Sequence, residues 1–504
     1  MFRGPRQTNG VSFLVPGRPT SPRPASGRPS GFRGRPRSGG SSRPSRPAVA
    51  SDLELALDAA ADAAAAETAA AETGAPAATF ASLGLPERLV TALARRELHA
   101  PFAIQTRSIP DALAGRDVLG RGATGSGKTL AFGLPLLTRL VGGERRRGTP
   151  RGLVLVPTRE LAQQVQDALA PLAQALDLKV MSIYGGASMG RQIDQLRRGV
   201  DLVVATPGRL KDLIEQRECS LAEVQVTVLD EADHMADLGF LPAVQELLDQ
   251  TDASTQRLLF SATLDRGVDK LVRQYLKDPA VHAVATAASR VTTMDHRVWA
   301  VQHDAKTDIA AEVASRPGRT LIFVRTKHGA DRLAIQLRKT GVEAGAIHGN
   351  LAQHARKRAL DDFSTGHARV LVATDVAARG IHVDDVDLVV HFDPPADHKD
   401  YLHRSGRTAR AGASGTVLSL VTSDQVRDHQ RLRERAGVEA SALSVVPGHP
   451  AVREVAASGE PIVLAPRPAY AARPSSDRRG SSAGRPRRAP ASAPRGPRPA
   501  RTAS

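Results

Sequence analysis

The stretch Val226-Thr-Val-Leu-Asp230-Glu231-Ala232-Asp233 runs from four apolar or β-branched residues into an acidic tetrapeptide. Upstream, Gly122-Ala-Thr-Gly-Ser-Gly-Lys128-Thr129 follows a second short apolar segment at 117–119. A glycine-rich loop and a carboxylate pair, each directly after a strand, are the two halves of a nucleoside-triphosphate site. Together the two stretches predict an α/β fold that hydrolyses a triphosphate.

The glycine-rich loop has the residue types that a phosphate cradle needs. Its glycines let backbone N–H groups approach phosphate oxygens that a side chain would block. Lys128 is expected to supply a positive charge to the β- and γ-phosphates, and the Thr129 hydroxyl to ligate Mg²⁺. Residues 130–140 predict a helix, which would place the phosphates at its N-terminus. The expected cradle comprises Gly122, Ala123, Thr124, Gly125, Ser126, Gly127, Lys128 and Thr129.

The acidic tetrapeptide is expected to serve the same site. We expect Asp230 to hold Mg²⁺ and Glu231 to orient or deprotonate the attacking water. Acidic runs are usually solvated faces, but the apolar strand directly before this one disfavours a surface run.

Both stretches belong to a longer ordered series of motifs, which resembles the DEAD-box family of ATP-dependent RNA helicases, of bacterial type. The resemblance covers about residues 79–425 and rests on the order and spacing of the whole set. The matching residues are Phe80, Gln105, Gly122–Thr129, Pro157–Ala162, Gly185-Gly186, Thr206–Arg209, Asp230–Asp233, Ser261–Thr263, Leu321–Val324, Gln353 with Arg356, Ala373–Asp375, Arg379-Gly380 and His403–Arg410.

The resemblance implies roles at the nucleotide. Gln105 would read the adenine edge, Phe80 would pack on the base and Asp375 would belong to the same binding set, with ATP and Mg²⁺ as cofactors. Arg407 and Arg410 match arginine fingers, which are worth about 10³–10⁵ in rate. The implied catalytic residues are Lys128, Asp230, Glu231, Arg407 and Arg410.

The same resemblance implies a coupling set and an RNA-binding set. Ser261 and Thr263 would link hydrolysis to strand separation, and His403 would bridge the two lobes near Asp233. The RNA backbone would be held from both lobes by Arg159, Gly186, Thr206, Gly208, Arg209, Arg325 and Thr374.

Two positions depart from the family pattern. Phe102-Ala103 stand where the family usually has Thr-Pro, two residues before the Ile104-Gln105 pair. His382 stands where the family has an aspartate that touches the ribose, with Asp384 and Asp385 nearby as candidates to compensate. Adenine-loop geometry and ribose contact are therefore expected to differ, whereas the hydrolytic residues are intact.

Short apolar runs alternate with helical stretches, a pattern typical of parallel sheets covered on both faces. We expect two RecA-like parallel-sheet domains in tandem, at 79–285 and 286–440. The expected remainder is a disordered Arg/Gly/Pro-rich tail at 1–50, an acidic Ala-rich helix or linker at 51–78, and a mostly disordered basic tail at 441–504.

The net charge of +17 comes mainly from the two ends of the chain. Residues 1–50 contain ten arginines and no acid, and residues 467–504 contain ten arginines and one aspartate. These arginine-rich ends are expected to bind phosphates regardless of sequence, with an affinity that falls steeply with salt. A purely solubilising role is the alternative interpretation.

The cysteine content and the lack of long apolar runs indicate where in the cell the protein is expected to act. The single cysteine, Cys219, excludes an internal disulfide and is typical of a reducing compartment. No apolar run approaches the ~20 residues of a membrane span, and the N-terminus has no signal-peptide core. We expect a cytoplasmic monomer, and the Ala, Arg and Gly content is typical of a GC-rich bacterial genome.

The leading hypothesis is an enzyme that couples ATP hydrolysis to local, sequence-nonspecific unwinding or remodelling of RNA duplexes. Ribosomal or decay complexes are candidate settings. Because only 3% of residues are aromatic, RNA is expected to be held by its backbone. Two alternatives stay open: a related helicase that acts on DNA, and a nucleic-acid chaperone that acts mainly through the arginine-rich ends.

Overall fold

The computed structural model describes residue 60 and residues 78–122, 125–284, 294–378, 386–409, 415–462 and 464. The expectations for residues 1–50, for residues 465–504 and for almost all of the acidic segment at 51–78 lie outside the described residues. The described residues form two parallel sheets, each flanked by helices.

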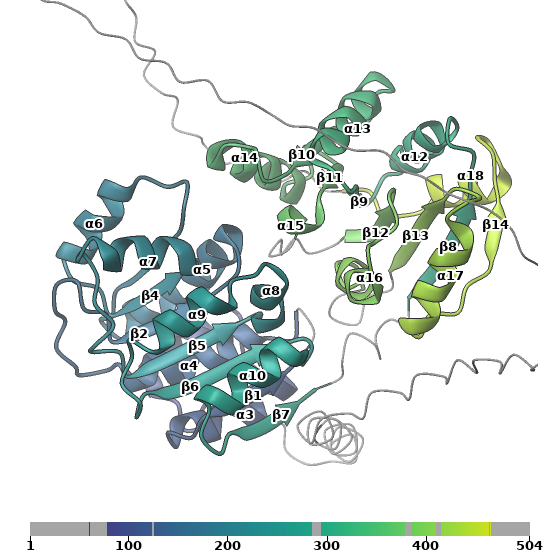
Figure 1. Ribbon diagram of the computed structural model, residues 1–504. Helices are drawn as coiled ribbons and strands as arrows, with labels where there is room; N and C mark the ends of the chain where they lie inside the picture. The colour runs from purple at the N-terminus through teal and green to yellow at the C-terminus, as the bar shows by residue number, and fades with distance from the viewer. Residues whose placement is uncertain are drawn as a thin grey trace, which may run out of the picture. The chain divides into compact units, whose positions relative to one another are not determined.

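The first sheet has seven parallel strands in the order β3-β4-β2-β5-β6-β1-β7, with helices on both faces (Figure 1). Its strands are β1 (Val118–Arg121), β2 (Gly152–Leu155), β3 (Val180–Ile183), β4 (Leu202–Ala205), β5 (Val226–Asp230), β6 (Gln256–Ser261) and β7 (Ala280–Ala283). Its helices are α2 (Glu87–Ala94), α3 (Ala103–Leu113), α4 (Lys128–Arg139), α5 (Arg159–Ala175), α6 (Met189–Arg197), α7 (Pro207–Glu215), α8 (Ala232–Asp237), α9 (Leu241–Leu248) and α10 (Arg266–Tyr275).

The second sheet also has seven parallel strands, in the order β10-β11-β9-β12-β13-β8-β14. Its strands are β8 (Asp295–Ala300), β9 (Arg319–Phe323), β10 (Ala344–Ile347), β11 (Val370–Ala373), β12 (Val386–His391), β13 (Thr416–Val421) and β14 (Ala442–Ser444). Its helices are α12 (Lys306–Ala314), α13 (Lys327–Lys339), α14 (Gln353–Ser364), α15 (Asp375–Ala378), α16 (His398–Ser405), α17 (Val426–Arg435) and α18 (Pro450–Ala456).

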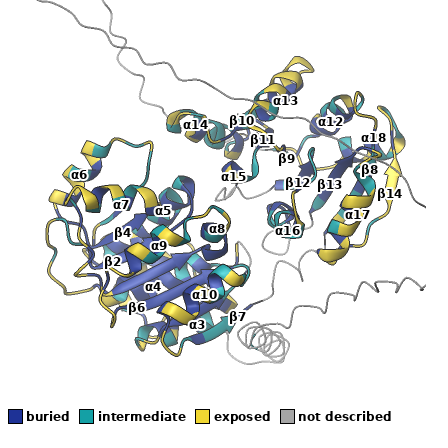
Figure 2. Ribbon diagram, in the orientation of Figure 1, coloured by how far each residue is buried: buried dark blue, intermediate teal, exposed yellow. Residues whose placement is uncertain are grey.

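The apolar runs are continuous because both faces of each sheet are buried. Side chains alternate between the faces of a strand. In β2, Val154 packs in the layer that includes Phe132 of α4, while Leu153 and Leu155 pack in the layer that includes Val244 of α9. The central strands of both sheets are accordingly mostly buried in Figure 2, whereas the outer faces of the helices are exposed. The expectation of two tandem RecA-like parallel-sheet domains is confirmed.

The second sheet continues past residue 440, where the sequence analysis ended the second domain. β14 pairs with β8 from Ala442–Val298 to Ser444–Ala300. Beyond it, Val452 and Val455 of α18 are buried in the same core as Trp299. The boundary at 440 is therefore wrong. All three β14 residues are exposed, so the strand lacks the apolar run that marks the other strands.

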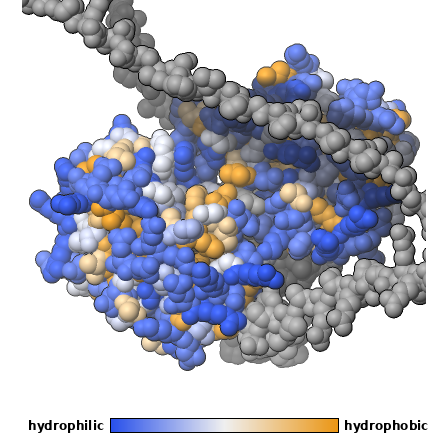
Figure 3. Space-filling view, in the orientation of Figure 1, coloured by the Kyte–Doolittle hydropathy of each residue, from blue (hydrophilic) through white to orange (hydrophobic). Residues whose placement is uncertain are grey.

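The surface on view is mainly hydrophilic, with small separate apolar patches over the described residues (Figure 3). Scattered patches of this kind are ordinary on a folded domain. None of the described helices combines the length and the apolar character that a membrane crossing requires.

Candidate nucleotide and RNA site

The glycine-rich loop and the carboxylates meet because their strands are close neighbours. β6 lies between β1 and β5. Arg121 at the end of β1 is level with Ser261, and Asp230 at the end of β5 is level with Phe260. The residues that follow these strands therefore share the carboxyl edge of the sheet, which is where open α/β sheets bind ligands.

The glycine-rich loop has the backbone of a phosphate cradle. Gly127 caps α4 with φ 87°, and a Cβ there would lie 2.4 Å from Nε2 of Gln105. Gly125 has φ 80°, a left-handed conformation that favours glycine. Ala123 and Thr124 lie outside the described residues. Glycine is therefore required at the N-cap of α4, where neighbouring side chains approach the backbone closely and the first-turn N–H groups are available to an anion.

Lys128 and Ser126 carry polar atoms that a phosphate would satisfy. The Lys128 ammonium is buried and donates to the carbonyl oxygen of Gly122 at 2.7 Å. The buried Ser126 hydroxyl has no hydrogen-bond partner among the described residues. A phosphate oxygen in the cradle would offer an acceptor to both groups, so this donor set fits a nucleotide phosphate.

Gln105 ties the start of α3 to the loop. Its Nε2 donates to the carbonyl oxygen of Gly127, and its Oε1 accepts from the N–H of Phe102, both at 2.9 Å. The side chain is 1% exposed. Phe80 is 3% exposed and packs in the core of the first sheet. Gln105 therefore borders the phosphate cradle. The contacts of Gln105 and Phe80 with adenine stay predictions.

Phe102 is a rim residue that the sequence analysis treated only as a departure. Its side chain is 58% exposed, although it is one of the largest apolar groups in the chain. A Cβ on Gly127 would lie 2.6 Å from its ring, so the ring borders the phosphate cradle. The signal for this role was an aromatic residue directly before the Gln105 segment.

Asp230 is a buried carboxylate with an unusual affinity for its proton. Burial raises its pKa to about 7, against the opposing effect of the Lys128 charge. A cation beside it would favour the charged form, and hard cations prefer carboxylate and hydroxyl oxygens. Thr129 lies in the first turn of α4, and its hydroxyl stays the predicted second oxygen ligand. The oxygen donors fit a magnesium ion.

Glu231 adopts a strained backbone. Its φ is 53° and its ψ 51°, a left-handed conformation that costs a non-glycine residue about 1–3 kcal/mol. Its N–H donates to Oδ1 of Asp230 at 3.0 Å. Its carboxylate oxygen Oε2 lies 2.8 Å from Nδ1 of His234, a residue that sequence reasoning missed. The available signal was the i, i+3 spacing, which brings a residue at a helix N-cap within reach of the third residue of that helix.

The expected coupling residues form one connected group. Oδ2 of Asp233 accepts from the N–H and from the hydroxyl of Thr263, both at 2.9 Å. The Ser261 hydroxyl donates to the Thr263 carbonyl oxygen at 2.7 Å and accepts from the Asp233 N–H at 3.3 Å. Burial acts to raise the pKa of Asp233, but the charges of His234, His403 and Lys128 hold it below its ordinary value.

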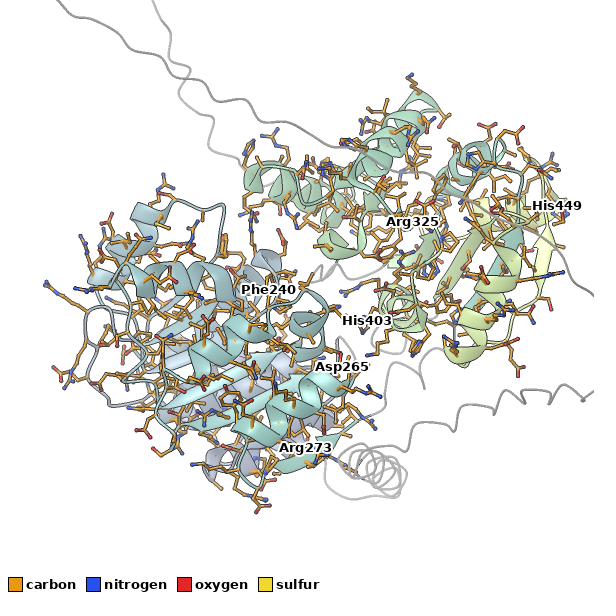
Figure 4. The ribbon with its side chains drawn as sticks, viewed as in Figure 1. Phe240, Asp265, Arg273, Arg325, His403 and His449 are labelled. Atoms are coloured by element: carbon orange, nitrogen blue, oxygen red, sulfur yellow. The ribbon has the colours of Figure 1, made fainter. Side chains whose placement is uncertain are left out.

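His403, on α16, is the fourth coupling residue (Figure 4). Its ring packs edge-on against the ring of His234, with centroids 4.8 Å apart. His234, Asp237 and His403 also present ligand atoms within 4.8 Å of one another, in the part of the chain that the structure describes. The second-lobe histidine is therefore next to the acidic tetrapeptide, as the family resemblance implied.

The second sheet carries the other nucleotide residues. Asp375, at the start of α15, accepts two hydrogen bonds from Arg404, at 2.6 and 2.8 Å. Arg404 was not singled out from the sequence. Arg407 follows α16 and is 4% exposed. Arg410 and residues 379–385, which include His382, Asp384 and Asp385, lie outside the described residues.

The RNA residues of the first sheet follow strands β2, β3 and β4. Gly186 has φ 85°, and a Cβ there would lie 2.5 Å from Nη1 of Arg159. Thr206 precedes α7, and Gly208 in its first turn faces open space. Arg209 donates to the carbonyl oxygen of Ala187 at 3.3 Å. Two helix N-termini and a glycine turn at one edge suit a phosphate backbone.

The RNA residues of the second sheet lie at its corresponding edge. Arg325 follows β9 and Thr374 follows β11, which is the neighbouring strand (Figure 4 labels Arg325). The Arg325 N–H donates to Oδ2 of Asp393 at 2.8 Å, which fixes the backbone there. The expected grouping by strand ends is thus present in each sheet.

Comparison with known proteins agrees with this geometry. Residues 102–271 match the model of the DEAD/DEAH box helicases, and residues 305–412 match that of the helicase conserved C-terminal domain. The fold and the site therefore define a two-domain helicase core. The chain belongs to the DEAD-box helicase family.

Two relatives show the extent of the similarity. The chain is 42% identical over 395 residues to DEAD-box ATP-dependent RNA helicase 3A, chloroplastic, of Zea mays. The aligned region covers 76% of this chain and 52% of that protein. The chain is also 42% identical over 346 residues to RNA helicase CrhR of Synechocystis sp. The aligned region covers 68% of this chain and 70% of that protein. The chain spans about half the length of the maize relative. Because one of these relatives is from a plant and the other from a cyanobacterium, the comparisons do not assign the chain to a bacterial type of helicase.

Solved structures with the same fold include two complexes. Saccharomyces cerevisiae Dbp5 bound to RNA and ADP BeF3 is 27% identical, with a TM-score of 0.67, over 75% of this chain and 99% of that chain. Mss116p bound to ssRNA and AMP-PNP is 26% identical, with a TM-score of 0.66, over 77% of this chain and 84% of that chain.

Proposed function

We propose that this chain is an ATP-dependent RNA helicase that couples ATP hydrolysis to local, sequence-nonspecific remodelling of RNA duplexes. The observation that carries the proposal is the phosphate cradle with Lys128 and the buried Asp230-Glu231 pair at the same carboxyl edge of the sheet, on strands that flank β6. The names of the relatives, and the RNA and nucleotide in the two solved complexes, support the choice of substrates.

Each residue at the cradle has a separate task in this proposal. Lys128 leaves the Gly122 carbonyl and neutralises phosphate charge, while Asp230 and Thr129 hold Mg²⁺. The magnesium ion, when bound, stabilises charge on the β- and γ-phosphates. Glu231 accepts the proton of the attacking water or orients it. Arg407 and Arg410 supply positive charge to the γ-phosphate in the transition state.

The division of the site between two domains makes RNA part of the mechanism. The ATP site needs residues of the first sheet and the arginines of the second. RNA binding needs the predicted RNA-binding residues at the carboxyl edges of both sheets. Each ligand that draws the two domains together therefore favours the binding of the other, which is a reciprocal coupling. Because the RNA residues are backbone N–H groups, hydroxyls and arginines, the contacts carry little sequence information.

We also propose a cellular setting for the enzyme. The enzyme acts as a cytoplasmic monomer of bacterial type, on structured RNA such as that of ribosomal or decay complexes. The buried Cys219, whose pKa burial raises to about 12, is an inert thiol that needs no oxidising compartment. The recognition of RNA by its backbone supports a broad range of RNA targets.

The test is steady-state ATP hydrolysis by the purified chain with RNA, with DNA and with neither. We expect stimulation by RNA and little by DNA. Glu231→Gln should bind ATP and RNA as the wild type does but lose about two to four orders of magnitude in turnover, because a general base contributes about that much. Equal stimulation by DNA would instead support the DNA helicase. RNA remodelling unchanged by Glu231→Gln would support the chaperone.

A further inference from the structure

His234 makes a direct contact with the carboxylate that handles water. Nδ1 of its ring lies 2.8 Å from Oε2 of Glu231, and the side chains of the two residues are 4% and 8% exposed. A hydrogen bond between such deeply buried groups is shielded from competing water. His234 is the third residue of α8 and Glu231 is the N-cap of that helix, so the contact is local to the start of the helix.

The contact fixes which nitrogen of the ring carries a hydrogen. A carboxylate accepts hydrogen bonds, so Nδ1 must be the donor toward Glu231. Nε2 of His234 is buried and has no hydrogen-bond partner among the described residues. The ring therefore has one strong polar contact, and that contact is with Glu231. A core histidine held only for packing would not need this orientation.

The Glu231 carboxylate needs a hydrogen-bond donor that holds it in one position. Glu231 is the N-cap of α8 but makes no side-chain capping hydrogen bond, so the free N–H groups of the helix end do not hold its carboxylate in position. A general base must stay within hydrogen-bonding reach of its water, and a displacement of about 1 Å can cost about a hundredfold in rate. The donor at Nδ1 restricts this movement while leaving the second carboxylate oxygen for other contacts.

We propose that His234 is a positioning residue for hydrolysis, which holds the Glu231 carboxylate toward the nucleotide site through Nδ1–H. This inference rests on the proposed ATPase function. The ring of His234 also packs against His403 of α16, whose ring meets it edge-on with centroids 4.8 Å apart. His234 thus connects the second domain's coupling residue with the carboxylate of the first.

The test uses side chains that imitate one ring nitrogen each. In His234→Asn the amide nitrogen takes the place of Nδ1, and in His234→Gln it takes the place of Nε2. His234→Leu keeps the apolar volume and removes both. RNA-stimulated kcat, KM for ATP, RNA affinity and melting temperature are measured for each variant. Met235→Leu is the matched control, because it changes a buried apolar side chain of the same helix and keeps the backbone N–H that donates to the Glu231 carbonyl oxygen.

We expect His234→Leu and His234→Gln to lower kcat about 10- to 100-fold with KM for ATP and RNA affinity within about twofold of wild type. His234→Asn should recover most of kcat, and Met235→Leu should match wild type. Equal losses in His234→Asn and His234→Leu, or losses that follow melting temperature, would overturn the positioning role. Failure of the proposed function is a separate result, because the wild type itself would then show no RNA-stimulated hydrolysis.

Discussion

At the scale of single residues, the hydrolytic set is ordinary for the family and its surroundings are particular to this chain. Phe102 is the clearest case, since the family has a small polar residue there. Its ring is 58% exposed and borders Gly127 at the rim of the cradle. An exposed aromatic face beside a nucleotide site offers a flat apolar surface to a base or sugar.

We predict that Phe102→Thr raises KM for ATP about two- to tenfold and leaves kcat within about twofold. Aromatic contacts contribute about 0.5–1.5 kcal/mol beyond the area that they bury, and this energy is lost equally in ground and transition states. The measurement is a titration of ATP at saturating RNA. Phe102→Tyr, which keeps the ring, serves as the control. An unchanged KM in Phe102→Thr would show that the ring is not in contact with nucleotide.

At the scale of elements, the second sheet depends on a strand and a helix beyond its apparent end. β14 extends the sheet beside β8, and α18 covers it. Glu312 of α12 accepts from the Gly448 N–H at 2.8 Å, which fixes the turn between these two elements. The edge of β8 and part of its core would be open without them.

We predict that a chain ending at residue 440 has a lower melting temperature in its second domain than a chain ending at residue 466. Loss of β14 exposes the backbone of β8, and loss of α18 uncovers Trp299. In the full chain, Val452→Ala should lower the free energy of unfolding by about 1–3 kcal/mol, because it removes two buried methyl groups. Calorimetry on all three proteins checks this, and equal melting temperatures would contradict it.

Buried histidines also make the second domain sensitive to acid. His391 and His429 pack against Tyr401, with ring centroids 5.0 and 6.1 Å apart. Burial, with a smaller effect of the Arg433 charge, lowers the pKa of His429 to about 4. Burial, with the charges of Arg404, His429 and His296, holds the pKa of His391 well below its ordinary value.

The unfolded chain therefore binds more protons than the folded one below about pH 6.5, where free histidine titrates. The stability from keeping His429 neutral is complete above that pH and is lost as the pH falls toward about 4. We predict a steep fall in the melting temperature of the second domain over this window. His429→Gln, which cannot titrate, should make the fall shallower. Equal slopes in the two proteins would rule out a contribution from His429.

At the scale of the whole molecule, charge and catalysis are separated along the chain. The predicted nucleotide-binding and catalytic residues lie between 80 and 410, whereas residues 1–50 and 467–504 contain twenty arginines and one acid. Nonspecific attraction to phosphates depends on the number of cations near the RNA. The core is expected to set the chemistry, and the ends are expected to raise the local affinity for RNA.

We predict that removing residues 1–50 and 467–504 weakens RNA binding and flattens its dependence on salt. Each lost phosphate contact lowers the slope of log affinity against log salt by about 0.7–0.9. ATP hydrolysis at saturating RNA should remain, because no catalytic residue is removed. RNA binding measured over a salt series tests this. An unchanged slope would favour the solubilising interpretation of the arginine-rich ends.

The sequence by itself determined the two parallel sheets and the residues at their carboxyl ends. Apolar strands that precede a glycine loop or an acidic tetrapeptide specify both, because local pattern and strand direction decide which end faces the ligand. Only the tertiary structure showed that His234 contacts Glu231, that Phe102 is exposed at the rim, and that β14 completes the second sheet. These features depend on side-chain direction and on long-range pairing, which neither composition nor periodicity encodes.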